Sequence, residues 1–385
     1  MTEVSGGTKY FGDPLGGLAA EAWDELARDR FYSSAFWLRL CALEAGGAAG
    51  GLHVDLPGGG RAAVPVIAVG DDPHPNCRWP DLLAARGLPS PPGRGMLVGQ
   101  LRGYLAHLLG PEHADAAAVA AGLLAEVRAA RPPVPADAMA RVGLYLTTPD
   151  VLALREAGVR AMPVLLGTDA WMEIPPGGWE AWLESLGSSH RVRRIRSEVR
   201  RFERAGYRVE QRTLSEAYAD VARLAFQVEQ RYGRARSIDP YLEGFRLQGA
   251  FAGARAQVLL CAYDDGPPVG CCLYYRDGDT IYLRAAGFDY ARLRGAAEYF
   301  NMAYYVPARL PGVRWLHAGT ATPDGKALRG ARLHPLWLLD LSRDSVLERY
   351  GDDVRAHNAA ARADLAGMSP AVAGALRDES WETFF

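Results

Sequence analysis

Some segments of the chain have apolar residues at helical spacing, and others have the short apolar or alternating runs of strands. Both kinds of segment occur along the chain, which predicts a mixed α/β protein. Apolar residues at a period of about 3.6 indicate helices, whereas short apolar or alternating runs indicate strands. In the first half, Ser33 or Ser34 caps a helix around Trp37. Residues 71–99 are rich in proline and glycine and predict a surface loop or lid with one short apolar segment. The other elements predicted in this half are helices at 19–28 and 114–130 and strands at 51–56, 61–69 and 142–146.

The second half shows the same alternation with clearer boundaries. Helices are predicted at 179–186, 190–205, 214–232, 241–252 and 295–308. Strands are predicted at 207–212, 257–263, 269–275, 280–285, 313–318 and 336–341, before helical material that runs to Trp381. Because the two halves have a similar order of elements, we expect a duplicated fold. The expected division is a domain at 1–160, a second domain at 161–345 and a helical tail at 346–385.

The composition is that of an ordinary globular protein. The chain has 385 residues, of which 49% are hydrophobic and 23% charged, and its formal net charge is −2. Its apolar runs are too short for a bilayer, and its first residues lack a secretory signal, so we expect a cytoplasmic protein with no membrane partner. The five cysteines show no zinc-type spacing, and His74 with Cys77 is a lone near-pair. No metal site is therefore expected.

Basic side chains are concentrated in one predicted helix. Residues 191–204 include seven arginines and two glutamates, a local balance of +5. Such a patch attracts a polyanion through phosphate contacts without reading sequence. The alternative is a solvated helix laced with Arg194–Glu198 and Arg200–Glu203 pairs. The residues assigned to a tRNA or phosphate patch are Arg191, Arg193, Arg194, Arg196, Arg200 and Arg201.

The order of several segments resembles the GNAT acyltransferase fold, specifically the proteins with two GNAT domains. The segments are Phe31-Tyr32-Ser33 with Trp37-Leu38, the Arg191–Arg204 helix, Val269-Gly270, Tyr282–Tyr290, Tyr299-Phe300-Asn301, and Lys326 through Arg329-Gly330. The group they resemble includes the Fem-type peptidyltransferases and the peptidoglycan-biosynthesis-like acetyltransferases. The resemblance spans about residues 30–341 and implies a tandem GNAT fold with a mixed sheet. It also implies an N-acyltransferase.

The resemblance implies that the acyl donor lies where two parallel strands separate, with its phosphate groups at the start of the next helix. The segment Arg292-Leu293-Arg294-Gly295-Ala296-Ala297 fits the acyl-CoA signature Arg/Gln-x-x-Gly-x-Gly/Ala. A glycine there lets backbone amides approach a pyrophosphate. The Fem-type branch uses aminoacyl-tRNA instead. The inserted helical arm of some wall-building Fem proteins is not present, which argues against a wall-building role.

We favour aminoacyl-tRNA as the donor and the amine of a small metabolite as the acceptor, with no tightly bound cofactor. The basic helix is the reason for this preference. Two alternatives stay open. One is an acyl-CoA-dependent N-acetyltransferase, and the other is a non-catalytic GNAT-like protein that binds RNA or an acidic partner.

Amide formation from an activated ester needs a neutral amine, an aligned donor and stabilisation of the tetrahedral oxyanion. It needs no covalent nucleophile, so the cysteines have no assigned role. The loop Gly319–Gly330 carries Lys326 and Arg329 on one side of a helical turn, where they either stabilise an anion or lie in solvent. Catalysis is assigned to Lys326, Arg329, Tyr282 and Asp289. Donor binding is assigned to Arg284, Arg292, Arg294, Gly295, Ala297, Tyr299 and Asn301.

Overall fold

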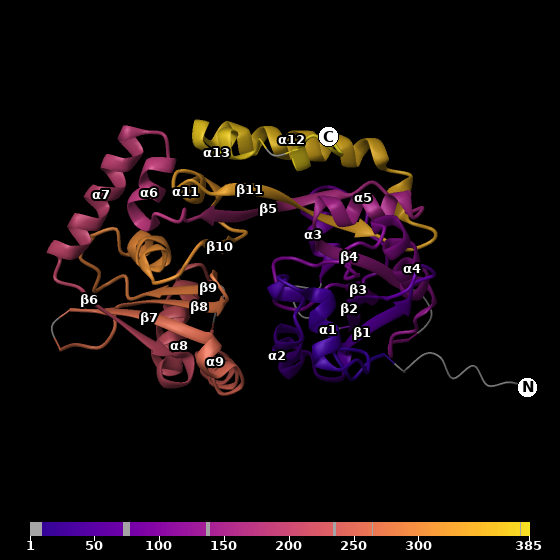
Figure 1. Ribbon diagram of the computed structural model, residues 1–385, viewed down its shortest axis with the longest axis horizontal. Coiled ribbons are helices and arrows are strands. Elements are labelled where there is room, and N and C mark those ends of the chain that lie inside the picture. The colour runs from indigo at the N-terminus through magenta and orange to yellow at the C-terminus, as the bar shows by residue number, and fades with distance from the viewer. Residues whose placement is uncertain (1–9, 72–77, 136–138, 234–235, 264, 378) are drawn as a thin grey trace, which may run out of the picture. The chain divides into compact units, whose positions relative to one another are not determined.

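The computed structural model describes residues 10–71, 78–135, 139–233, 236–263, 265–377 and 379–385. The chain forms two compact units (Figure 1). Unit 1 contains the described residues up to Asp169 together with His334–Phe385, and unit 2 contains Ala170–Leu333. The chain passes from one unit to the other within strand β5, Val164–Glu173, and again within β11, Arg332–Asp340. The domain boundaries expected from the sequence stay a prediction.

Unit 1 contains helices α1–α5, α12 and α13. Their bounds are α1 Ala20–Ala27, α2 Ala35–Ala45, α3 Trp79–Ala84, α4 Ala116–Ala129, α5 Thr148–Glu156, α12 Gly351–Met368 and α13 Pro370–Ala375. Its strands besides β5 and β11 are β1 Ala49–Asp55, β2 Arg61–Val69, β3 Gly95–Val98 and β4 Ala140–Leu146. Short 3₁₀ helices lie at η1 Phe31–Ser33, η2 Gly46–Ala48, η7 Val346–Glu348 and η8 Glu379–Trp381.

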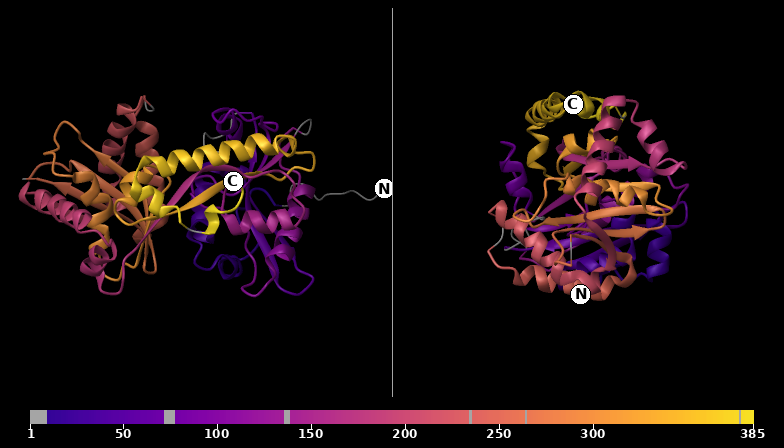
Figure 2. Two further views of the ribbon diagram at one scale, coloured as in Figure 1. Left: turned by 90° about the horizontal axis from the view of Figure 1, so that it is seen from above. Right: turned by 90° about the vertical axis from the view of Figure 1, so that its left-hand side faces the viewer.

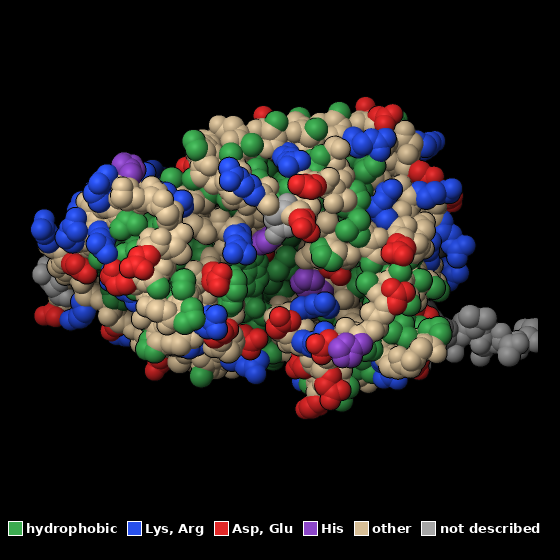
Figure 3. All heavy atoms as spheres, turned by 45° about the horizontal axis from the view of Figure 1, so that its top comes forward, with side chains coloured by type: hydrophobic (Ala, Val, Ile, Leu, Met, Phe, Trp, Pro, Cys, Tyr) green, Lys and Arg blue, Asp and Glu red, His purple; other side chains and the backbone are tan. Residues whose placement is uncertain are grey.

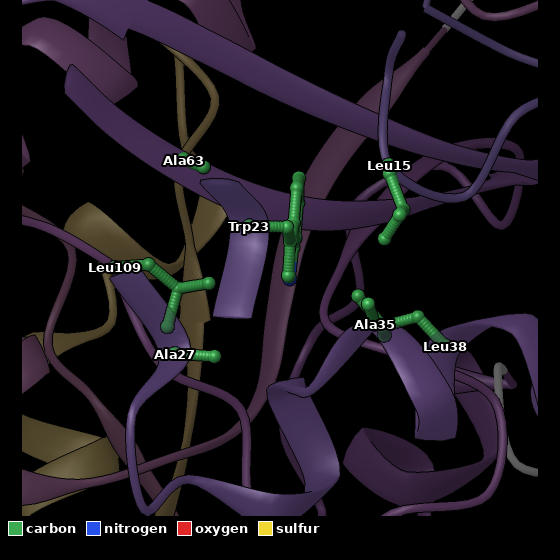
Figure 4. Packing of buried hydrophobic residues seen from close by; sticks show 7 residues of the cluster. All are labelled: Leu15, Trp23, Ala27, Ala35, Leu38, Ala63 and Leu109. Atoms are coloured by element: carbon green, nitrogen blue, oxygen red, sulfur yellow. The ribbon is translucent and has the colours of Figure 1, made fainter. Parts of the chain in front are cut away.

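The sheet of unit 1 has the strand order β1-β2-β3-β4-β11, with β3 and β4 parallel and the other neighbours antiparallel. Trp23 of α1 lies at the centre of an apolar cluster and donates its indole N–H to the Ser33 carbonyl at 2.7 Å. Around it pack small and aliphatic side chains from α1, α2, β2 and the neighbouring loops (Figure 4). The indole therefore buries a large apolar surface without losing its hydrogen bond.

Unit 2 contains helices α6–α11. Their bounds are α6 Gly178–Ser185, α7 Ser189–Arg204, α8 Leu214–Arg231, α9 Asp239–Ala252, α10 Glu298–Phe300 and α11 Pro323–Ala327. The strands are β6 Arg208–Thr213, β7 Ala256–Ala262, β8 Gly270–Asp277, β9 Thr280–Phe288 and β10 Trp315–Gly319. A π-helix, η5, follows α10 at Asn301–Tyr305, and 3₁₀ helices lie at η4 Gly253–Arg255 and η6 Pro307–Arg309.

The sheet of unit 2 has the strand order β5-β10-β9-β8-β7-β6. Strands β9 and β10 are parallel, whereas the other neighbouring strands of this sheet are antiparallel. Helices α8 and α9 cover one face of strands β7–β9, and α7 with the α10–η5 segment lies on the opposite face (Figures 1 and 2). The core of this unit is therefore a sheet between two helical layers.

Two predictions about elements are wrong, and two elements were not predicted. The loop expected at 71–99 contains helix α3 and strand β3, because the apolar run Gly95–Val98 pairs with two neighbouring strands. Helix α5 and strand β5 were not predicted. The helix expected at 295–308 begins only at Glu298 and continues as the π-helix η5. Among the described residues, no helix combines the length and apolar character that a bilayer crossing requires.

Candidate functional site

Strands β9 and β10 separate partway along their length. They are paired in parallel only where Trp315, Leu316 and His317 face Thr280, Ile281 and Tyr282. Beyond this point β9 continues to Phe288, still paired with β8, while β10 ends at Gly319. A register shift between His317 and Gly319 also changes the pairing of β10 with β5. Unit 2 therefore contains a separation of two parallel strands, which is the feature that the resemblance implies for the donor site.

Aromatic rings surround the last paired position. His317 is fully buried, and its ring centroid lies 4.6 Å from that of Trp171 and 5.5 Å from that of Tyr282. Tyr282 is also buried, on strand β9, which has a neighbouring strand on each side. His317 was not singled out from the sequence, because a lone histidine in an apolar strand carries no distinctive spacing.

Lys326 lies at the open end of this separation. It sits on α11, is 2% exposed, and its ammonium donates a hydrogen bond of 2.7 Å to the carbonyl of Gly319, the last residue of β10. The alternative of a solvent-exposed turn is therefore wrong. A cation removed from water interacts strongly with any negative charge that develops nearby. Lys326 is consequently the best-placed candidate in this loop to stabilise an oxyanion.

Arg329 is equally buried but has a different environment. Its guanidinium donates to the Glu198 carboxylate at 2.8 Å and to the Tyr305 hydroxyl at 2.7 Å, and lies 3.4 Å from the centroid of the Phe300 ring. Tyr305 also donates to Glu198. Burial raises the pKa of Tyr305 well above its ordinary value, so the hydroxyl stays protonated. Because Glu198 balances its charge, Arg329 is better suited to holding the loop in place than to binding a phosphate.

The inner face of α7 is attached to the same loop. Arg191 is half-buried, and its guanidinium donates to the carbonyls of Leu328 at 2.8 Å and Ala327 at 2.5 Å. Burial, and then the nearby charge of Arg329, lower the pKa of Arg191. Glu198 lies on the same inner face, 3% exposed. The Arg191 side chain thus binds the carbonyl end of α11, and its place in a phosphate patch stays a prediction.

The outer face of α7 carries the exposed arginines, which are Arg193, Arg194, Arg196, Arg200, Arg201 and Arg204. They follow helical spacing and so occupy one side of the helix. Basic side chains gather at the end of unit 2 that carries α7 (Figure 3). Arg194 pairs with Glu198 and Arg196 with Glu180.

Four arginines of this outer face, Arg193, Arg200, Arg201 and Arg204, form no ion pair with any residue that the structure describes. The expected Arg200–Glu203 pair is not found. A carboxylate oxygen of Glu203 lies instead 3.8 Å from a guanidinium nitrogen of Arg309, the last residue of η6. Part of the helix is thus salt-bridged, as the alternative predicted, and part of it is exposed without an ion pair among the described residues.

The predicted acyl-CoA loop is filled by a side chain of the protein itself. The Glu298 carboxylate is 4% exposed and accepts hydrogen bonds from the amides of Arg294 at 3.0 Å and Ala296 at 2.9 Å. The Tyr207 hydroxyl also donates to it, at 2.8 Å. Gly295 has a φ of +69° and Ala297 a φ of +58°, and these left-handed residues turn the loop around the carboxylate. Sequence reasoning missed Glu298 and Tyr207.

The arginine side chains of this loop are held beside an aromatic ring. The guanidinium of Arg294 lies 3.9 Å from the centroid of the Tyr263 ring and donates to the Ala205 carbonyl, and that of Arg292 lies 5.6 Å from the same ring. The Tyr263 hydroxyl donates to the Arg292 carbonyl at 3.1 Å. The two arginines therefore share the Tyr263 ring as a cation–π partner, just after the end of strand β7.

The other predicted site residues are dispersed. Asn301 is buried, and its side chain donates to the carbonyls of Ala297 at 3.0 Å and Glu198 at 3.3 Å, so it braces the helix start against α7. Tyr299 is 40% exposed and its hydroxyl lies 3.2 Å from that of Tyr304. Arg284 and Asp289 are half-buried on and just after β9. The sequence-predicted residues thus divide between the Lys326 loop, the Glu298 loop and the end of β9.

Buried thiols in β7 and β8 are expected to be unreactive. Burial raises the pKa of Cys261 and of Cys271 to about 12, and it raises the pKa of Cys272 as well. Because the thiolate is the reactive species, we expect no alkylation of these three by iodoacetamide at pH 8 in the native protein. Complete alkylation should follow denaturation, and peptide mass spectrometry measures both. Labelling of native Cys271 at the rate of the unfolded chain would contradict the core assignment. His74 and Cys77 lie outside the described residues.

Comparisons with known proteins agree with this arrangement. Residues 189–319 match the family model of the GNAT acetyltransferase domain. No curated protein sequence matches the chain. The chain is similar in structure to FemX, with a TM-score of 0.57 and 14% identity over 86% of this chain and 98% of that chain.

Two further solved structures are similar. The C-terminal domain of a putative lysylphosphatidylglycerol synthetase from Agrobacterium fabrum has a TM-score of 0.52 and 13% identity over 86% of this chain and 95% of that chain. A conserved protein of unknown function from Bacteroides thetaiotaomicron has a TM-score of 0.51 and 10% identity over 80% of this chain and 90% of that chain. At these identities the likeness concerns the fold. The predicted GNAT-type mixed α/β fold is confirmed: residues 189–319 match a GNAT acetyltransferase domain, and the chain shares its fold with FemX.

Proposed function

We propose that this acyltransferase moves an aminoacyl group from a charged tRNA to the amine of a small molecule, forming an amide. The observation that carries the proposal is the outer face of α7. Four of its arginines have no ion pair within the described part of the chain, although the protein as a whole has a formal charge of −2. Acidic residues elsewhere balance the total charge but leave this helix available to a phosphate backbone. Counterion release on such a surface is the main source of sequence-independent nucleic-acid affinity.

The connection between α7 and the Lys326 loop supports the same proposal. The outer face of α7 is basic, while its inner-face residues Arg191 and Glu198 bind the α11 carbonyls and Arg329. A donor held by its phosphates on the outer face is therefore bound next to the element that carries Lys326. FemX and a putative lysylphosphatidylglycerol synthetase domain have the same fold, which is consistent with this class of donor.

The chemistry proposed for the site uses few side chains. The amine nitrogen attacks the ester carbonyl carbon of the donor and forms the new C–N bond. The C–O bond to the tRNA 3′-terminal ribose then breaks, and the proton lost by the amine ends on the released ribose hydroxyl. The Lys326 ammonium donates a hydrogen bond to the carbonyl oxygen as negative charge develops on it. Arg329, Glu198 and Tyr305 keep α11 in position and make no contact with the reacting atoms. No covalent enzyme intermediate is needed, which agrees with the protonated, buried thiols.

Binding of tRNA should depend steeply on salt, and this dependence should weaken when the outer face of α7 is neutralised. We expect the combined variant Arg193→Ala, Arg200→Ala, Arg204→Ala to reduce the slope of log K against log[salt] by about one per arginine. Filter binding or fluorescence anisotropy between about 50 and 200 mM salt measures the slope.

The matched control for this titration is Arg314→Ala. Arg314 is also exposed, lies in unit 2 and has no ion pair among the described residues, but it is far in sequence from α7. Its variant should keep the wild-type slope. If the triple variant and Arg314→Ala bind tRNA with the same affinity and slope as the wild type, α7 is not the donor surface.

A further inference from the structure

Glu298 makes an unusual set of contacts for an acidic side chain. One of its oxygens, Oε1, accepts from the Arg294 amide, the Ala296 amide and the Tyr207 hydroxyl, at 3.0, 2.9 and 2.8 Å. The Arg294 amide also lies 2.9 Å from the Tyr207 hydroxyl oxygen. Burial raises the pKa of Tyr207 far above its ordinary value, so the hydroxyl remains a donor. The carboxylate is thus enclosed by the loop rather than exposed beside it.

The amides that Glu298 binds belong to the segment that fits the acyl-CoA signature. Successive backbone N–H groups that converge on one point form a concave site for an anion, and here the point is already occupied by a carboxylate oxygen. A pyrophosphate in this loop would have to displace Glu298 or lie against its negative charge. At contact distance and away from water, repulsion between two anions is large.

We propose that Glu298 is a specificity-determining residue: it fills the phosphate-binding loop and excludes pyrophosphate-bearing donors such as acyl-CoA from it. The loop retains the glycine and the backbone shape of an anion site, but the anion is a side chain of the protein. The identity of the accepted donor, aminoacyl-tRNA bound by α7, rests on the proposed function. The exclusion itself depends on Glu298, Arg294, Ala296 and Tyr207 alone.

Removing the carboxylate should convert the loop into an anion site. We expect Glu298→Ala to gain about 3 °C or more in melting temperature on addition of inorganic pyrophosphate or CoA, because a ligand that binds only the folded state stabilises it. The wild type should gain no more than it does from sodium chloride at the same ionic strength. Glu298→Gln, which keeps the shape of the side chain and loses its charge, should show a smaller gain than Glu298→Ala.

The matched control is Tyr207→Phe. This substitution removes one hydrogen bond to Glu298 and loosens the loop, but it leaves the carboxylate in place. It should therefore show no pyrophosphate response beyond that of the wild type. A response of Tyr207→Phe equal to that of Glu298→Ala would overturn the proposal, since the gain would then come from loosening of the loop and not from the missing charge.

A measurement on the wild type keeps the proposal testable if the alanine variant does not fold. The amides of Arg294 and Ala296 should be protected from hydrogen exchange without ligand, and CoA should leave their exchange rates unchanged. Slower exchange of these amides in the presence of CoA would overturn the proposal, as would a folded Glu298→Ala that does not respond to pyrophosphate. Neither result depends on tRNA, so failure of the exclusion is distinguishable from failure of the α7 donor assignment.

Discussion

Replacing Lys326 with methionine should reduce the rate of acyl transfer by about 10²–10³-fold while the protein stays folded, which is the cost of losing one oxyanion donor. Methionine has a similar length and suits a site where the native side chain is 2% exposed. It cannot donate a hydrogen bond to the carbonyl oxygen of the donor. Single-turnover transfer with saturating donor measures the chemical step, and circular dichroism checks the fold.

The control for this prediction is Arg332→Met, which removes an exposed cation a few residues further along the chain. Arg332 has a side-chain exposure of 70% and a loose ion pair of 3.7 Å with Glu173. Its variant should retain the wild-type rate. A folded Lys326→Met that also retains the full rate would remove Lys326 from the mechanism.

Replacing Glu198 with alanine should lower the free energy of unfolding by about 3–5 kcal/mol, because it leaves the Arg329 guanidinium buried without a counter-charge. The two side chains are 4% and 2% exposed, and their charged atoms lie 2.8 Å apart. The Tyr305 hydroxyl loses its acceptor in the same variant. Urea denaturation followed by tryptophan fluorescence measures the loss.

A matched variant on the same helix is Glu203→Ala. The Glu203 side chain is 61% exposed and lies 3.8 Å from Arg309, so its removal should cost no more than about 1 kcal/mol. Combining Glu198→Ala with Arg329→Met should recover part of the lost stability, since neither member of the buried pair is then left without its partner. An equal loss in Glu198→Ala and Glu203→Ala would show that the buried pair does not hold the loop.

The elements that position the site could largely be predicted from the sequence. The helix predicted at 190–205 forms at Ser189–Arg204, and the meander predicted at 257–285 forms as β7, β8 and β9. These segments have strong periodicity and clear turn signals, so local pattern decides their structure. Strand β3 could not be predicted in the same way, because its four residues, which begin with Gly95, become a strand only when β2 and β4 pair with them.

Only those residues of the candidate site that have a distinctive signal in the sequence could be predicted. The isolated lysine in the Gly319–Gly330 loop pointed to Lys326, but its burial depends on how α11 packs. Glu198 had a usable signal, since it falls on the apolar stripe of α7 between Ile195 and Phe202, where an acidic residue needs a buried partner. Glu298 had no such signal. Its contacts depend on the left-handed turn at Ala297, which sequence propensity does not favour.

The most direct measurement compares amide formation by the wild-type protein from two alternative donors, charged tRNA and acetyl-CoA. The protein is incubated with a pool of small-molecule amines and either tRNA charged with labelled amino acids or labelled acetyl-CoA, each with and without prior ribonuclease treatment. We predict a labelled amide from charged tRNA that ribonuclease abolishes, and none from acetyl-CoA. A labelled amide from acetyl-CoA that is insensitive to ribonuclease, with none from charged tRNA, would contradict the proposed function.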